Sequence, residues 1–137
     1  MRTLITLMAF VVVVLVVAVG RIPEGEVAEL VTFDRKGHGI ETRLWIVDLD
    51  GETWVRAPKL DASWLLRLRL NPTAHLSRDE GLVSVLAFPS SDPEVRRAVN
   101  LAMLRRYGRL ERAFRWLRNP EQTVPVRLEK LAPARRS

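Results

Sequence analysis

Few residues of this chain have both the type and the spacing that catalysis or metal binding requires. The only histidines are His38 and His75, and neither has a second ligand at metal-binding spacing. The chain has no cysteine, which excludes disulfides, Cys-ligated zinc, iron–sulfur clusters and thiol nucleophiles. No serine lies in a Gly-x-Ser-x-Gly turn, and no pair of carboxylates is assigned to acid–base work. We therefore expect no metal site, and a cofactor would have to carry any redox chemistry.

The side chains that could bind a partner are mainly cationic. Lys and Arg together number 22 against 16 Asp and Glu, and the formal net charge is +6. Nearly all of the cations are arginine, whose guanidinium makes two-point contacts with phosphate or carboxylate better than an ammonium does. The candidate anionic partners are a phosphorylated cofactor, lipid headgroups and nucleic acid. Nucleic acid is the least favoured of these, because no DNA- or RNA-binding motif accompanies the charge.

One loop combines two cations with two glycines. It spans 34–39 (DRKGHG), so that Arg35 and Lys36 directly precede Gly37. Backbone N–H groups of such a loop can form a concave anion site, and the two cations would add charge-assisted hydrogen bonds to a phosphate. The alternative is an ordinary solvated hairpin loop, which the sequence alone favours.

Six short strands are predicted to position these residues. Asp50-Gly51 predicts a tight two-residue turn that pairs the second and third strands antiparallel. Pro125 lacks a backbone donor, which predicts that the last strand is an edge strand or pairs on one side only. The six segments are bounded by turn residues and cover 26–33, 41–48, 52–57, 73–78, 82–88 and 122–130.

Three helices are predicted between these strands. Asp61 is expected to cap a short helix that Asn71-Pro72 ends. A second helix begins at Asp92-Pro93, and Gly108 separates it from a third over 109–117. Short, mostly antiparallel strands with few helices predict a mainly β (α+β) domain, built as a small barrel or a curled sheet.

Several segments share their order and spacing with a known family. They are ELVTFDRKGHG with RLWIV, then DGETWVRA, then SWLLRLRLNPTAHL, in which Leu44-Trp45, Trp64 and Asn71-Pro72 fit the family's pattern. Most of 27–131 resembles the FMN-binding split-barrel superfamily, close to its deazaflavin-dependent nitroreductase branch and related uncharacterised bacterial proteins. The resemblance implies a six-stranded antiparallel split β-barrel with peripheral helices that binds FMN or a deazaflavin.

The resemblance also implies where the cofactor would lie. In this family the third strand and the following helix supply phosphate contacts, and residues near the start of that helix lie beside the ring system. The alternative is that Trp64 is a core residue and that the cations are surface charges. The implied cofactor-binding residues are Arg35, Lys36, Trp45, Arg56, Lys59, Ser63, Trp64 and Arg67.

The densest group of charges lies in the predicted C-terminal helices. Arg105, Arg109, Arg112 and Trp116 are spaced to share one helix face. Such a face could lie on anionic lipid, at about 1 kcal/mol per basic residue near the surface, or contact a protein partner. The alternative, a solvated helix face, is the one we favour. The arginines of these helices are Arg96, Arg97, Arg105, Arg106, Arg109, Arg112, Arg115 and Arg118.

The chain begins with an apolar run that predicts its location. Residues 3–20 (TLITLMAFVVVVLVVAVG) carry no charge and lie between Arg2 and Arg21. This length is enough to cross a bilayer and predicts a single-pass membrane anchor. The alternative is a signal peptide cleaved near Gly20, with the domain exported. We expect the anchor or signal over 1–21, a split-barrel domain over 22–131 and a disordered tail over 132–137.

Two functions follow from these expectations. The first is a membrane-tethered flavin- or deazaflavin-dependent oxidoreductase, dimeric as split barrels commonly are, that reduces a small or lipid-soluble acceptor such as a quinone. The second is a non-catalytic membrane-anchored split barrel that binds anionic lipid or a protein partner through its arginine-rich helices. Asp34 is the residue that distinguishes these two functions. It stands where the family prefers Gly, and its negative charge would repel a cofactor phosphate.

Overall fold

A computed structural model describes residues 27–78, 81–114 and 119–132, and for 109–114 it describes the backbone alone. All six predicted strands are present close to their predicted bounds. The elements are β1 (Val27–Phe33), β2 (Gly39–Leu49), β3 (Glu52–Ala57), α2 (Ser63–Leu70), β4 (Thr73–Arg78), β5 (Gly81–Pro89), α3 (Pro93–Phe114) and β6 (Val124–Lys130).

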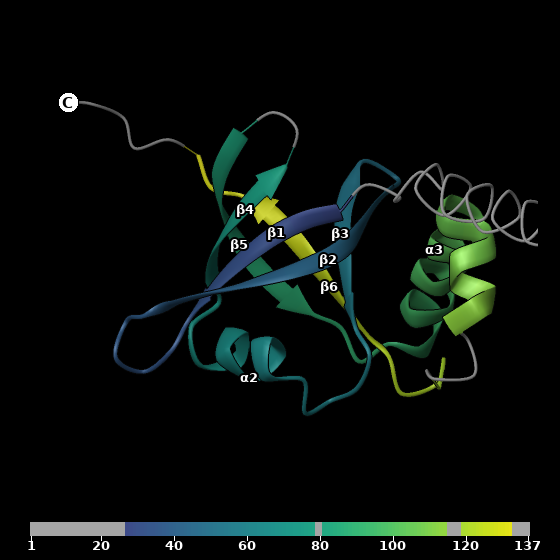
Figure 1. Ribbon diagram of the computed structural model, residues 1–137, viewed down its shortest axis with the longest axis horizontal. Coiled ribbons are helices and arrows are strands. Elements are labelled where there is room, and N and C mark those ends of the chain that lie inside the picture. The colour runs from purple at the N-terminus through teal and green to yellow at the C-terminus, as the bar shows by residue number, and fades with distance from the viewer. Residues whose placement is uncertain (1–26, 79–80, 115–118, 133–137) are drawn as a thin grey trace, which may run out of the picture.

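The six strands close into a barrel in the order β1-β2-β3-β6-β5-β4 (Figure 1). Every neighbouring pair is antiparallel. Three of the pairs are hairpins between consecutive strands, and β5 pairs with β6 across α3. The barrel closes where β1 pairs with β4 and β3 pairs with β6, strands that are far apart in the sequence. This architecture confirms the predicted six-stranded antiparallel barrel.

Alternate residues of each strand fill the barrel, because successive side chains of a strand point to opposite faces. The registers place Leu30 opposite Leu76 and Ile46 opposite Val55, and all four side chains are buried. Small residues such as Ala57 and Ala74 occupy other inward positions. The core is therefore a packed interior of aliphatic side chains.

The turns form where the sequence predicts them. Asp50 and Gly51 both have positive φ, at 53° and 77°, which is the backbone conformation that a two-residue type I′ hairpin needs. Asp92 caps α3, because its Oδ1 accepts the backbone N–H of Glu94 at 2.9 Å, and Pro93 is the first helical residue.

The predicted cap of α2 is wrong. Ala62 is the N-cap residue, and no side chain caps the helix. Asp61 lies one residue too early for that role, and its carboxylate lies 3.6 Å from Nζ of Lys59 instead. The first backbone bond of the helix runs from Leu66 N–H to the carbonyl of Ala62.

The prediction that Pro125 makes its strand an edge strand is also wrong, since β6 pairs with both β3 and β5. The N–H and C=O of one strand residue point to the same side. The carbonyl of Pro125 accepts from Ser90 N–H, just past the last β5 pair at Pro89. The backbone nitrogen of Pro125, which has no hydrogen to donate, therefore faces the end of β5. The ladder between β6 and β3 loses no hydrogen bond.

The two helices cover different parts of the barrel (Figure 1). The helix α2 contributes Trp64, Leu65 and Leu68 to the same buried cluster as the barrel interior. A second buried cluster lies outside the barrel, where Met103 and other residues of α3 pack on Trp54 and its neighbours in β2 and β3. The structure thus has two cores, one inside the barrel and one between the barrel wall and α3.

Gly108 interrupts α3 with φ 41° and ψ −102°, at the point where the sequence predicts a break between two helices. The predicted membrane or signal segment over 1–21, residues 133–137 of the predicted tail and residues 115–117 of the last predicted helix lie outside the described residues. Neither α2 nor α3, within the part of the chain that is described, is long and apolar enough to cross a membrane.

Candidate functional site

The loop between β1 and β2 is closed by its own acidic residue. Oδ1 of Asp34 accepts the backbone N–H groups of Lys36 and His38, each at 2.9 Å, and Oδ2 lies 3.2 Å from the His38 ring. The backbone N–H of His38 is the main reason that the pKa of Asp34 lies below its ordinary value of 3.8. The carboxylate therefore occupies the place that a bound anion would take in a concave loop of N–H groups.

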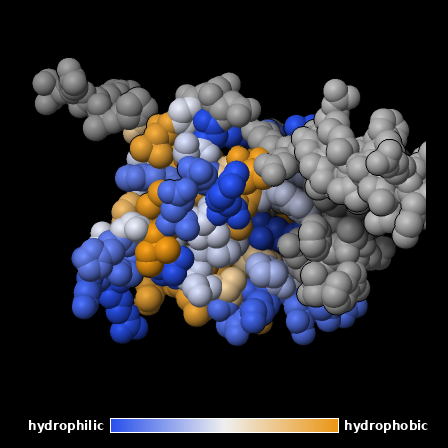
Figure 2. Space-filling view, viewed as in Figure 1, coloured by the Kyte–Doolittle hydropathy of each residue, from blue (hydrophilic) through white to orange (hydrophobic). Residues whose placement is uncertain are grey.

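The two cations of this loop are not drawn into these contacts. Arg35 and Lys36 are both exposed, at a hairpin that extends from the barrel at the lower left of Figure 1. Figure 2 shows a hydrophilic surface at the same place. The loop therefore offers two side-chain cations to solvent, but the backbone donors of Lys36 and His38 are already used.

Helix α2 presents a second group of candidate residues at one end of the barrel. Ser63, Leu66, Arg67 and Leu70 follow i, i+3, i+4, i+7 and share the face turned away from the core. Leu66 and Leu70 are 46% and 62% exposed, which leaves an apolar strip beside Arg67. Trp64 points the other way and is part of the barrel core.

Arg67 connects this helix to the strand that leads into the loop. Its Nε donates to Oγ1 of Thr32 at 2.8 Å, and Thr32 is fully buried. Thr32 precedes Asp34 by two residues, so α2 and the cationic loop lie at the same end of the barrel. Lys59 lies before α2, exposed and paired with Asp61. The structure thus brings Arg67 to β1, the strand that leads into the loop of Arg35 and Lys36.

Trp45 and Arg56 lie elsewhere, on the outer barrel wall that α3 covers. The Trp45 ring stacks on Tyr107 of α3, with centroids 4.6 Å apart. Arg56 is 8% exposed, and its Nη1 donates to Oδ1 of Asn100 at 3.0 Å. Asn100 in turn donates to the carbonyl of Pro120, so Arg56 belongs to a network that holds α3 on the barrel. These two side chains contribute to α3 packing, and a role for them in cofactor binding stays a prediction.

The remaining histidine has a packing role. His75 lies on the outer face of β4, and its ring meets the ring of Phe33 edge-on with centroids 5.2 Å apart.

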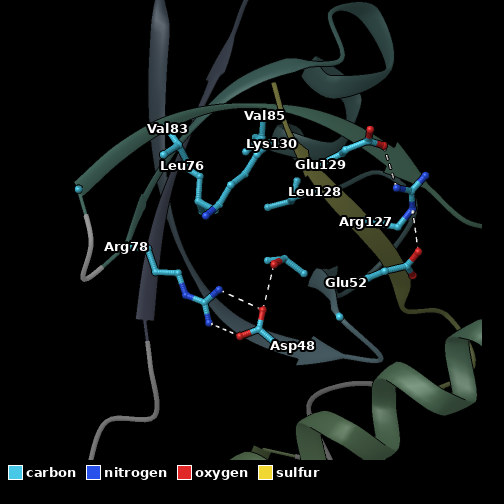
Figure 3. A pocket seen from close by; sticks show the side chains of 13 residues that line it. Asp48, Glu52, Leu76, Arg78, Val83, Val85, Arg127, Leu128, Glu129 and Lys130 are labelled. Carbon is cyan, nitrogen blue, oxygen red and sulfur yellow. Dashed lines mark hydrogen bonds and ion pairs between the residues drawn. The ribbon is translucent and has the colours of Figure 1, made fainter. Parts of the chain in front are cut away.

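The sequence did not lead us to predict a group of charged residues at the end of the barrel away from α2. A cavity of about 670 Å³ opens there, and none of the eight predicted cofactor residues lines it (Figure 3). Asp48, Arg78 and Lys130 stand at inward-facing positions of β2, β4 and β6. The sequence pattern does indicate the direction of one of these side chains. Lys130 continues the alternation of Val124, Val126 and Leu128, which predicts that it points inward.

Comparison with known proteins identifies the fold. No protein-family model matches the chain, and no curated protein matches it significantly. A conserved hypothetical protein from Mycobacterium tuberculosis is 22% identical with a TM-score of 0.57, over 82% of this chain and 75% of that one. HutZ, the heme storage protein from Vibrio cholerae, is 16% identical with a TM-score of 0.62, over 82% and 86%. An F420 reductase is 15% identical with a TM-score of 0.54, over 79% and 88%. The chain is therefore a split-barrel protein in its fold.

Proposed function

We propose that this protein is a membrane-tethered oxidoreductase of the split-barrel type, which binds FMN or a deazaflavin and reduces a small or lipid-soluble acceptor. Residues 3–20 would hold it at the membrane, close to such an acceptor. The fold supports the proposal, since it is shared with an F420 reductase. The single observation that carries it is the bond from Arg67 to Thr32, which joins the exposed face of α2 to the strand before the cationic loop.

The residues at this end suit a phosphorylated ring cofactor in two respects. Arg35, Lys36 and Arg67 supply cations for phosphate, and the exposed Leu66 and Leu70 supply an apolar surface for a ring system. When bound, such a cofactor supplies the hydride chemistry that the side chains of this chain do not. A second copy of the chain would complete the cleft, as the resemblance to dimeric split barrels implies.

One residue limits how the phosphate would be held. Asp34 takes the N–H groups of Lys36 and His38, so side chains and not the loop backbone would make the phosphate contacts. We therefore expect weaker cofactor binding than a loop with Gly at this position would give.

A cofactor titration tests the proposal. The full chain in nanodiscs of neutral lipid is titrated with FMN and, separately, with F420, and quenching of cofactor fluorescence is measured. We expect binding of one of the two, and a loss of about tenfold in affinity for Arg67→Met, because a hydrogen bond to a charged group is removed. Arg105→Gln, an exposed cation on α3, is the matched control and should bind as the wild type does. Absence of quenching by both cofactors would overturn the proposal.

A non-catalytic role is the second candidate, and Asp34 is the observation that favours it. In this role the cationic surface of α3, which includes the exposed Arg97, Arg105 and Arg106, would lie on anionic lipid. Arg96 is not free for this, since its Nε donates to the carbonyl of Thr123. Amide hydrogen exchange of α3 should slow in anionic nanodiscs but not in neutral ones. Equal exchange in both, or slowing that survives replacement of all three exposed arginines by Gln, would exclude it.

A further inference from the structure

The barrel has an open mouth away from α2, and it forms a pocket of its own. The pocket lies between the β2–β3 turn, the facing ends of β4 and β5, and the end of β6 (Figure 3). Its volume of about 670 Å³ lies within the usual range of small-molecule sites. It shares no residue with the proposed cofactor site, so an inference drawn from it is independent of that proposal.

The floor of this pocket is apolar. Leu76 faces Val83 across β4 and β5, and Val85 and Leu128 lie on the same inward face. Leu76, Val85 and Leu128 are at most 5% exposed, so they form the layer of the barrel core that lies next to the mouth. A ligand that entered the mouth would meet aliphatic side chains at depth.

One wall of the pocket carries an ion pair between Asp48 and Arg78. Arg78 donates from Nη1 and Nη2 to the two carboxylate oxygens of Asp48, at 3.1 and 2.6 Å. Thr53 donates from Oγ1 to the same carboxylate at 2.9 Å. The charges of Asp48 and Arg78 cancel, so this wall offers no net charge to a ligand.

The opposite wall carries the ammonium of Lys130, which makes no such hydrogen-bonded pair, although its positive charge is among the causes that lower the pKa of Asp48. Lys130 stands opposite Val85 in the register, which directs it inward, and its side chain reaches into the pocket in Figure 3. Among the described residues, no hydrogen bond or ion pair engages its Nζ. The two remaining acids of the lining, Glu52 and Glu129, face outward, and both contact Arg127. The inward-facing charges therefore leave one positive charge above an apolar floor.

We propose that the barrel mouth is a binding site for a small monocarboxylate with an apolar chain or ring. The carboxylate pairs with Nζ of Lys130, and the apolar part lies on Leu76, Val85 and Leu128. A single ammonium matches a monoanion better than a phosphate dianion. A cationic amphiphile is disfavoured, because the one inward-facing carboxylate is already held by Arg78.

Three probes of equal chain length test this site. Hexanoate, hexan-1-ol and hexylammonium are titrated into the full chain in neutral nanodiscs, with empty nanodiscs subtracted, and binding is followed by calorimetry. We expect hexanoate to bind more tightly than the alcohol, and the ammonium to bind least. Equal binding of hexanoate and hexan-1-ol, or no binding of any probe above empty nanodiscs, would overturn the proposal.

Variants of Lys130 make the test specific to this residue. Lys130→Gln should weaken hexanoate binding about tenfold, because a charge-assisted hydrogen bond is lost. Lys130→Glu should reverse the preference toward hexylammonium, which a loss of folding would not produce. Arg69→Gln removes an exposed cation from α2, away from the barrel mouth, and should leave hexanoate binding unchanged. Unchanged binding in Lys130→Gln, or loss of all binding in Lys130→Glu with a native thermal transition, would overturn the assignment.

Discussion

Tyr107 stacks on Trp45 with the two rings 8° from parallel, and this contact fixes α3 against the barrel wall. The same tyrosine completes a strand. Its hydroxyl accepts the backbone N–H of Ile46 at 3.1 Å and donates to the carbonyl of Ile46. The last described pair of β1 and β2 joins Val27 to Trp45, so the hydroxyl serves the next backbone groups along β2. The sequence shows neither relationship, since Tyr107 lies 61 positions after Ile46.

Tyr107→Phe should keep the ring stack but leave the N–H and C=O of Ile46 without this partner. We expect a loss of about 2 kcal/mol in the free energy of unfolding, since unsatisfied buried backbone groups are costly. Urea denaturation followed by tryptophan fluorescence measures it. Leu101→Ala, at an exposed position of the same helix, should change stability by less than about 0.5 kcal/mol. Equal midpoints for the wild type and Tyr107→Phe would contradict this account of α3 docking.

Asp34→Gly should raise cofactor affinity. The substitution removes a negative charge and frees the N–H groups of Lys36 and His38, which a phosphate can then use. We expect about a tenfold gain for the cofactor that binds, measured by the same fluorescence titration. Asp34→Asn keeps an acceptor for these N–H groups and removes only the charge, so its gain should be smaller. An unchanged affinity in Asp34→Gly would favour the non-catalytic function.

Asp48 should make stability depend on acid pH. Its pKa is lowered from 3.8, first by the hydrogen bonds from Arg78 and then by that from Thr53. Because the folded-state pKa lies below the unfolded value, the stabilisation is present above that value and is lost as pH falls through the folded pKa. Thermal midpoints of the wild type and Asp48→Asn, measured between about pH 2 and pH 6, should differ at the upper end and converge at the lower end. A constant difference over this range would show that the ion pair does not stabilise the fold.

Gly39→Ala should destabilise the start of β2. A Cβ atom there would lie 2.9 Å from Cγ1 of Val31 and 3.4 Å from the Phe33 ring. We expect a loss of about 1–3 kcal/mol, the usual range for overpacking, measured by urea denaturation. Glu41→Ala, two residues along the same strand and exposed, is the control and should be close to neutral. A neutral Gly39→Ala would mean that Val31 and the Phe33 ring move aside without cost.

Local chemistry determined much of the secondary structure. The strands, the Asp50-Gly51 turn, the Asp92 cap and the break at Gly108 all follow from propensities that act over a few residues. The order of these elements also sufficed for the resemblance to split barrels. The cap of α2 and the pairing of β6 were predicted wrongly, because each depends on where a backbone group faces and not on residue type alone.

The tertiary structure decided which side chains meet. Trp45 and Arg56 have the types that a cofactor cleft needs, but closure of the barrel and docking of α3 place them in a packed outer face. Lys130 follows an apolar alternation, yet its exposure to a pocket depends on β6 pairing with β5 at the barrel mouth. A residue's type and its face on a strand are local properties. The partner across the sheet is set by pairings between distant segments, and those form only when the whole barrel closes.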